Sequence, residues 1–301
     1  MATVQPASPA TPYPEHLRAE VERYLGALRF TAERPCGGLE QAMRYSLLAD
    51  GKRIRPVLAL ATAEAIDRPP ASVLPLAAAI ELIHTYSLIH DDLPAMDDDD
   101  LRRGRATCHR AFGEDVAILA GDGLYAEAFR LLLSEQQADP ASLLAAAREL
   151  AAATGVQGMV GGQYVDVAGT APATPDGLRR LHELKTGRLI AASIECVLLL
   201  AGREGHDTIA AYRSFATELG VLFQIVDDIL DVTGSPQTLG KRRGSDERLG
   251  KRTYVSEFGL AGAQRLASES YERARVALAE AAPSGALELE QITDFIANRT
   301  Y

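Results

Sequence analysis

The chain has 301 residues, of which 47% are hydrophobic and 24% are charged, a composition typical of a soluble globular protein with a substantial core. Its net charge of −10 argues against a nucleic-acid partner, and no run of about 18 apolar residues indicates a membrane span. Its few cysteines, Cys36, Cys108 and Cys196, lie far apart and favour a reducing compartment, so we expect a cytoplasmic protein without disulfides.

Residues 1–14 are rich in Pro and Ala and lack the pattern of a signal peptide, so we expect a disordered tail followed by one domain over 15–301. Apolar residues at helical spacing predict helices over 71–92, 179–201 and 219–231. No alternating pattern predicts a β-strand. The stretch 233–250 lacks helical patterning, and a loop of that length is usually functional or disordered. The sequence therefore predicts a single all-α domain.

The first aspartate-rich stretch directly follows an apolar segment. Asp91 and Asp97 are six residues apart, so on an unbroken helix their side chains would point about 120° away from each other. Pro94 lies between them and cannot continue a helix without the loss of a backbone hydrogen bond. We therefore predict that the helix ends near Asp92 and that the chain turns, which brings Asp97 back beside Asp91.

A second aspartate-rich stretch lies on a predicted helix, where Asp227 and Asp231 are four residues apart and face the same way. Carboxylates crowded at the end of an apolar helix repel one another unless a cation neutralises them. Ligand sets made only of oxygen favour hard ions such as Mg²⁺, which commonly also binds substrate phosphates. The two stretches together predict several Mg²⁺ ions around a diphosphate. The alternative for either stretch alone is a solvated acidic face.

Three basic segments accompany the acidic ones. They are GKRIRP at 51–56, LRRGR at 101–105, and the stretch 241–252, which has six basic and two acidic residues. Lys and Arg provide the charge-assisted hydrogen bonds that bind diphosphates. Any one of these segments alone is more simply explained as salt-bridged surface, but their coincidence with two acidic stretches favours a phosphate-binding function.

These residues resemble the trans-isoprenyl diphosphate synthases, in particular the bacterial-type farnesyl diphosphate synthases, from about residue 38 onward. Residues 87–109 (SLIHDDLPAMDDDDLRRGRATCH) are similar to the first aspartate-rich motif of that family, and 223–231 (FQIVDDILD) to the second. Residues 239–254 resemble its flexible lysine-bearing loop. GKRIRP, GGQYVD at 161–166 and LKTG at 184–187 occur in the same order as in the family.

The resemblance implies a bundle of about ten or more helices around a deep central cavity. It implies Mg²⁺-dependent condensation of isopentenyl diphosphate with dimethylallyl or geranyl diphosphate, giving farnesyl diphosphate and pyrophosphate. Three Mg²⁺ ions are expected, with metal-site residues Asp91, Asp97 and Asp227, supported by Asp92 and Asp231. The diphosphate of isopentenyl diphosphate would contact Lys52, Arg55, His84 and Arg103. The allylic diphosphate and its metals would contact Arg102, Lys185, Thr186, Gln224, Lys241 and Lys251.

Product length is expected to depend on the residues before the first motif. Tyr86 is five residues before Asp91, about 7.5 Å back along a helix, where its ring could form a floor for the growing tail. Ser87 is adjacent to Tyr86 and belongs to the same predicted chain-length region. An aromatic residue at this position resembles the farnesyl diphosphate synthases, so we predict a C15 product; an ordinary core tyrosine is the alternative.

Other functions compete with this interpretation. A geranylgeranyl diphosphate synthase (C20) is the nearest rival. A terpene cyclase would not need the second diphosphate site indicated by GKRIRP and Arg103, and a non-catalytic partner subunit would tend to lose its aspartates. The resemblance also implies a homodimer. Two departures from the family are Val255, where Pro is frequent, and the ending NRTY, which lacks a terminal basic residue and leaves the role of the C-terminus open.

Overall fold

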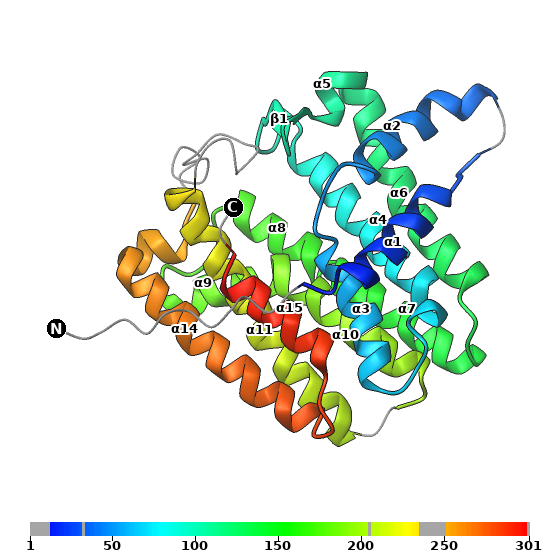
Figure 1. Ribbon diagram of the computed structural model, residues 1–301. Coiled ribbons are helices and arrows are strands. Elements are labelled where there is room, and N and C mark those ends of the chain that lie inside the picture. Colours follow the sequence, from blue (N-terminus) through cyan, green and yellow to red (C-terminus); the bar gives the residue numbers. More distant parts are fainter. Residues whose placement is uncertain (1–12, 32–33, 204–205, 235–250, 300–301) are drawn as a thin grey trace.

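Helix α4 (Leu74–Asp91) lies at the centre of the computed structural model, which describes residues 13–31, 34–203, 206–234 and 251–299 (Figure 1). It packs against the helices α1, α2, α3, α6 and α10. The helix with its preceding turn, Pro70–Asp91, is long and apolar enough to cross a membrane, with a mean hydropathy of 1.5, but 61% of its most apolar window is buried inside the protein. Such burial is typical of a core helix.

Of the described residues 77% are helical and very few lie in strands, which confirms the predicted all-α fold. The helices before residue 160 are α1 (Glu15–Ala27), α2 (Gly37–Leu47), α3 (Ile54–Ala65), α4, α5 (Cys108–Phe112), α6 (Glu114–Glu135), α7 (Pro140–Thr154) and α8 (Met159–Val167). Later helices are α9 (Pro175–His182), α10 (Arg188–Leu200), α11 (His206–Thr233), α14 (Tyr254–Ala281) and α15 (Leu287–Ala297). Short 3-10 turns cover Arg34–Cys36 and Pro70–Val73.

Most of the predicted tail (residues 1–12) and most of the predicted loop (residues 235–250) lie outside the described residues. Of the expected tail only residues 13 and 14 are described, and Tyr13 is buried, with its ring 4.8 Å from that of Phe295. Its hydroxyl donates to the carbonyl of Lys52 at 2.7 Å. The segment just before α1 is therefore packed against α15 and the basic turn that precedes α3.

The end of α4 follows the prediction closely. The helix ends at Asp91, and the backbone N–H of Asp97 donates to the carbonyl of Asp91 at 2.9 Å. Further backbone bonds to the carbonyl of Leu93 close the turn, with donors at Met96 and Asp98. Asp98 adopts a left-handed conformation with φ 52°, which Asp tolerates better than most residues. The turn therefore brings the two ends of the first motif together.

A short hairpin after this turn was not expected from the sequence. Strands β1 (Leu101–Arg102) and β2 (Arg105–Ala106) pair antiparallel, with Leu101 opposite Ala106. Arg103 and Gly104 form the turn, both with positive φ. Two-residue strands contain too few positions for an alternating pattern, which explains why no sequence signal predicted them.

The predicted helix over 179–201 is divided by a π-helical turn, η3 (Glu183–Gly187), between α9 and α10. Two glycines allow other helices to approach this turn closely. A Cβ on Gly162 of α8 would lie 2.4 Å from the backbone nitrogen of Lys185, and one on Gly220 of α11 would lie 3.0 Å from Cα of Gly187. π-Turns within helices frequently mark functional sites.

Helix α11 confirms the predicted helix over 219–231 but is buried more completely than a two-faced pattern suggests. Leu219, Leu222 and Val226 belong to the main core, whereas Val221 and Ile225 pack in a second apolar cluster with Tyr254 of α14 and Leu178 of α9. The acidic side of α11 therefore faces a protein-lined cavity and α14 rather than open solvent.

Candidate active site

A large cavity of about 1440 Å³ lies between the ends of α4 and α11. Among the described residues predicted from the sequence, only Asp92 is absent from its walls, and Lys241 lies outside the described residues. The predicted residues that line the cavity are Lys52, Arg55, His84, Tyr86, Ser87, Asp91, Asp97, Arg102, Arg103, Lys185, Thr186, Gln224, Asp227, Asp231 and Lys251. Residues that are up to 199 positions apart in the sequence, from Lys52 to Lys251, thus meet around one hollow.

The first acidic cluster has polar partners on two other elements. Gln163 of α8 donates to Oδ1 of Asp91 at 2.7 Å, and Lys251, which precedes α14, donates to Oδ1 of Asp97 at 2.8 Å. The pKa of Asp91 is raised to about 6 by burial and, less strongly, by the charge of Asp97, although the Lys185 ammonium opposes this rise. Burial therefore disfavours the ionised form of Asp91, and a bound divalent cation would offset that penalty.

The second acidic cluster meets a residue that sequence reasoning missed. Arg299, which follows α15, donates to Oδ1 of Asp227 at 2.7 Å. Its guanidinium lies 4.3 Å above the ring of Phe223, and its side chain is only 6% exposed. The role of the C-terminus was open from the sequence because no basic residue ends the chain, but a basic side chain two positions earlier enters the site.

Asp228, although part of the second motif, has a structural role. Its Oδ2 accepts from the backbone N–H of Tyr254 at 2.7 Å, at the start of α14, and its Oδ1 accepts from Nε2 of Gln224 at 2.7 Å. Gln224 in turn accepts from the Thr186 hydroxyl at 3.0 Å. Thr253 caps α14 through a reciprocal pair of bonds with Ser256, so the helix begins regularly without a Pro at 255.

Asp92 faces away from the cavity. Both of its carboxylate oxygens accept from Arg102 at 2.6 to 2.9 Å, and it lines a smaller neighbouring pocket. The bidentate pair fixes the hairpin β1–β2 against the end of α4, and a supporting role of Asp92 in a metal site stays a prediction. Asp231, the other supporting residue, is buried in the cavity wall.

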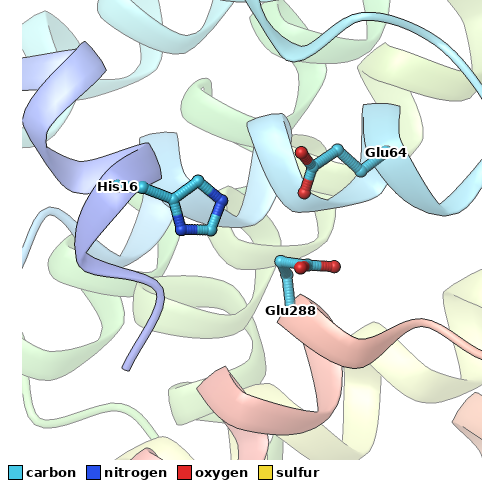
Figure 2. A group of neighbouring side chains, drawn as sticks. All are labelled: His16, Glu64 and Glu288. Atoms are coloured by element: carbon cyan, nitrogen blue, oxygen red, sulfur yellow. The ribbon is translucent and has the colours of Figure 1, made fainter. Parts of the chain in front are cut away.

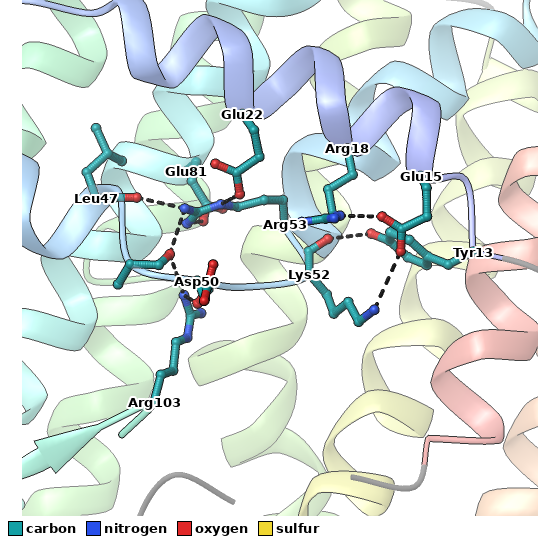
Figure 3. Close-up of polar contacts among 11 residues, drawn as sticks. Tyr13, Glu15, Arg18, Glu22, Leu47, Asp50, Lys52, Arg53, Glu81 and Arg103 are labelled. Atoms are coloured by element: carbon teal, nitrogen blue, oxygen red, sulfur yellow. Dashed lines mark hydrogen bonds and ion pairs between the residues drawn. The ribbon is translucent and has the colours of Figure 1, made fainter. Parts of the chain in front are cut away.

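The GKRIRP turn is held in place by Arg53 (Figure 3). Arg53 has a left-handed backbone with φ 51° and is 4% exposed. Its guanidinium donates to Glu22 of α1 and to Glu81 of α4, both at 2.8 Å, and to the carbonyls of Leu47 and Ala49. This middle arginine of the motif therefore joins α1, α2 and α4, while its neighbours remain available to the cavity.

Lys52 and Arg103 lie at the rim of the cavity. The Lys52 ammonium is 3.5 Å from Glu15 and lies over the rings of Tyr13 and Phe295, at 5.7 and 5.3 Å from their centroids (Figure 3). Arg103 extends from the β1–β2 turn and donates to the carbonyls of Asp50 and Ala49. Both side chains are largely exposed, so either can turn toward an anion at little cost.

Arg55 and His84 form the basic inner wall. Nη1 of Arg55 is 3.3 Å from Nε2 of His84, and the guanidinium lies 5.6 Å from the Phe223 centroid. Nε of Arg55 is buried without a hydrogen-bond partner among the described residues. Burial lowers the pKa of both side chains, and the Arg55 charge lowers that of His84 further. The unpartnered Nε–H of Arg55 is therefore able to donate to a negatively charged group in the cavity.

On the opposite side, the π-turn η3 aims Lys185 and Thr186 at the cavity. Lys185 donates to Oδ2 of Asp166 at 2.6 Å, and Asp166 lies on α8 in the GGQYVD motif. That motif was recognisable in the sequence, but no role could be assigned to its residues there. In the structure its Gln163 supports Asp91 and its Asp166 supports Lys185. These supporting residues could have been found from the motif, whereas Arg299 could not.

Aromatic rings close the cavity behind the first acidic cluster. Tyr86 lines the cavity, and its ring makes an edge contact with Tyr125 of α6 at 5.0 Å. Tyr125 contacts Phe129 at 5.4 Å and its hydroxyl is 3.2 Å from that of Thr154 on α7. Ser87, also in the wall, donates to the carbonyl of His84 at 2.9 Å. Of these three rings only Tyr86 lines the cavity, and Tyr125 and Phe129 pack behind it against the core.

Known proteins are similar to this chain in both sequence and fold. The chain is 43% identical over 284 residues to the farnesyl diphosphate synthase of Geobacillus stearothermophilus, covering 93% of each chain. It is also 43% identical over 264 residues to a chloroplastic geranylgeranyl pyrophosphate synthase of Capsicum annuum, covering 87% of this chain and 71% of the relative.

A crystal structure of a geranyltransferase from Helicobacter pylori, complexed with magnesium and isoprenyl diphosphate, superposes with a TM-score of 0.83 at 31% identity and covers 96% of both chains. A profile of the polyprenyl synthetase family matches residues 37–283, which include both acidic motifs and most of the cavity wall. The chain belongs to the polyprenyl synthetase family.

Proposed function

We propose that this prenyltransferase is a farnesyl diphosphate synthase, which condenses isopentenyl diphosphate with dimethylallyl diphosphate and then with geranyl diphosphate. The observation that carries the proposal is the meeting of Asp91 and Asp227, from two acidic motifs, in one cavity that also contains the basic wall of Arg55 and His84. Two substrates with diphosphate groups require two binding regions, and the acidic and basic sides of the cavity provide one each.

Enzymes of this family depend on Mg²⁺ in general, and the residues of the acidic side fit that ion. The donors are carboxylates contributed by α4, by the turn after it and by α11, and burial raises the pKa of Asp91 to about 6, a penalty on the ionised carboxylate that a bound cation would offset. We propose that Asp91, Asp97, Asp227 and Asp231 hold three ions together with the allylic diphosphate. When bound, Mg²⁺ neutralises the charge that develops on the departing diphosphate.

The protein side chains then have distinct roles in the reaction. Lys185, Thr186, Gln224 and Lys251, with Lys241 by resemblance, stabilise the diphosphate as the allylic C–O bond breaks and its electron pair leaves with the oxygen. Arg55 and His84, with Lys52 and Arg103 at the rim, orient isopentenyl diphosphate so that its double bond forms the new C–C bond. A proton is then lost to the diphosphate that has just departed, so no protein base is needed.

The Tyr86 ring in the cavity wall supports a C15 product. Tyr86 is five residues before Asp91 on α4, about 7.5 Å from it along the helix axis. Tyr125 and Phe129 stand behind it, so the tail meets a rigid stack of rings. The farnesyl and geranylgeranyl relatives are both 43% identical to this chain, but the match covers 93% of the farnesyl synthase and 71% of the geranylgeranyl synthase. Overall similarity therefore favours the same choice as this local geometry.

We also propose a cytoplasmic homodimer with one catalytic domain over 15–301 in each subunit. The apolar residues Leu119 and Leu133 of α6 and Leu144 of the neighbouring α7 are more than half exposed. Large exposed apolar side chains on adjacent helices favour a protein interface. Sedimentation equilibrium would test this, and a monomer at all concentrations would contradict it.

The deciding experiment for function is a product assay with dimethylallyl and isopentenyl diphosphates, in Mg²⁺ and after its removal with a chelator. We expect farnesyl diphosphate with Mg²⁺ and no product without it. Asp91→Asn should lower kcat by at least about a hundredfold, which is about 3 kcal/mol in the barrier. Asp98→Asn, in the same acidic run but exposed, is the matched control and should retain activity. A predominant C20 product would favour the geranylgeranyl alternative.

A further inference from the structure

A second group of potential metal ligands lies outside the cavity, where α1, α3 and α15 meet (Figure 2). His16 comes from α1, Glu64 from α3 and Glu288 from α15. One ligand atom from each, an imidazole nitrogen or a carboxylate oxygen, lies within 4.8 Å of the other two. None of these residues lines the large cavity. Glu64 is nine residues beyond Arg55 on the same helix, about 13 Å along its axis.

The carboxylates of this group lack compensating positive charge. Glu20 lies one helical turn after His16 on α1. Among the described residues, Glu20, Glu64 and Glu288 take part in no ion pair. One carboxylate oxygen of Glu20 and one of Glu64 are buried and have no hydrogen-bond partner among the described residues. Buried carboxylate oxygens of this kind call for a cation.

We propose that His16, Glu64 and Glu288 bind a divalent transition-metal ion of the Zn²⁺ type. The imidazole distinguishes this site from the carboxylate-only set in the cavity, since nitrogen donors favour Zn²⁺ and similar ions over Mg²⁺. Three protein ligands with a water molecule form a familiar tetrahedral arrangement. Bonds of about 2.0–2.2 Å place tetrahedral ligands roughly 3.5 Å apart, so the side chains must close by about 1 Å.

A metal ion bound at this site would have a structural effect. It would fasten α1 and α15 to α3. The segment before α1 contributes Tyr13, which packs on Phe295 of α15, and α15 leads directly to Arg299 in the cavity. An ion bound only to the folded protein stabilises it in proportion to its affinity. Metal binding here should therefore hold two elements of the active-site wall in place.

The test uses the full chain with Asp91→Asn and Asp227→Asn, so that the cavity no longer competes for metal. Calorimetric titration with Zn²⁺ should reveal one tight site. Adding His16→Ala should weaken binding at least tenfold, as should Glu64→Gln. Because His16 is exposed, its removal should leave the fold intact, which circular dichroism would verify. With Co²⁺ as the probe, the visible absorption of a nitrogen-containing site should appear and should vanish with His16→Ala.

Two control substitutions distinguish this site from metal binding elsewhere on the protein. His90→Ala removes an imidazole that lines the cavity, and Glu280→Gln removes an exposed carboxylate of α14; neither should affect Zn²⁺ binding. Zn²⁺ should also raise the melting temperature of the chain with Asp91→Asn and Asp227→Asn, but not that of the same chain with His16→Ala added. Binding that survives His16→Ala, or that disappears with His90→Ala, would overturn the proposal, as would the absence of any Zn²⁺ site in the doubly substituted chain.

Discussion

Arg299 donates to Oδ1 of Asp227 at 2.7 Å and thereby joins the segment after α15 to the second acidic motif. Its guanidinium and that of Arg55 both lie on the ring of Phe223, at 4.3 and 5.6 Å from the centroid. Burial lowers the pKa of Arg55 and the positive charge of Arg299 lowers it further, although the carboxylate of Asp227 opposes this effect. We propose that the two guanidinium groups form a seat for the diphosphate of isopentenyl diphosphate.

Replacement of Arg299 tests this seat. We expect Arg299→Ala to raise the KM for isopentenyl diphosphate at least tenfold, about 1.4 kcal/mol, because a charge-assisted contact is lost. The KM for geranyl diphosphate should change much less. Steady-state kinetics with each substrate varied in turn would measure both, and Arg299→Lys should recover part of the loss. An equal effect on the two substrates would place Arg299 elsewhere in the reaction.

The Tyr86 ring in the cavity wall predicts how product length responds to mutation. Tyr86→Ala should shift the product from C15 toward C20, because the tail then reaches Tyr125. Tyr86→Phe keeps the ring and should leave the product unchanged, which makes it the matched control. The double change Tyr86→Ala, Tyr125→Ala should lengthen the product further. Chromatography of the dephosphorylated products provides the measurement; a C15 product from Tyr86→Ala would exclude Tyr86 as the floor.

The buried pair of Arg53 and Glu81 predicts a large effect on stability. Glu81→Leu removes one of two carboxylates that neutralise a buried guanidinium, so we expect a loss of about 3–5 kcal/mol in the free energy of unfolding. Glu22→Gln, at the partly exposed partner, should cost less. Combining Glu81→Leu with Arg53→Met should restore much of the stability. Urea unfolding would measure all of them, and a double variant no better than Glu81→Leu would contradict this account.

The pH dependence of stability should reflect His182. Its ring is buried and stacks on Tyr254 at 5.6 Å, and neither ring nitrogen has a hydrogen-bond partner in the part of the chain described. Burial lowers the pKa of His182 to about 4, from 6.5 when exposed. Between these values the unfolded chain binds a proton that the folded one does not, so stability falls as the pH drops from 6.5 to about 4.

This acid sensitivity amounts to at most about 3 kcal/mol. His182→Phe keeps the stacking but cannot be protonated, and it should reduce the loss of stability on going from about pH 7 to about pH 4.5. Urea unfolding of both proteins at the two pH values would show the difference. Identical losses in the two proteins would mean that other groups determine the acid response.

The sequence predicted the parts of the site that depend on local chemistry. Pro94 and the spacing of Asp91 and Asp97 were enough to predict the fold-back turn, and the backbone bond between those aspartates confirms it. The helical period placed Asp227 and Asp231 on one face of α11, and both line the cavity. Such features are determined by neighbours within one or two helical turns, which is the range where spacing is informative.

Features that depend on contacts between distant segments could not be predicted. Arg299 becomes part of the site only because α15 packs beside α3 and α11. Asp228 has the same residue type as its neighbour Asp227 but supports the backbone of Tyr254 instead. The π-turn η3 arises where Gly162 and Gly220 permit close approach by two other helices. None of these partners is close in sequence, so no local pattern reveals them.

The π-turn also bears on how such an active site can originate. A π-turn contains one residue more than the α-helical turn it replaces, so it amounts to a single-residue insertion that a packed helix has absorbed. Deleting one residue between Glu183 and Gly187 would restore a regular helix and rotate every upstream side chain by about 100° relative to α10. Lys185 would then lose its direction toward the cavity, although the helix itself would become more regular. The direction of the Lys185 side chain therefore depends on an irregular turn that a regular α-helix would not contain.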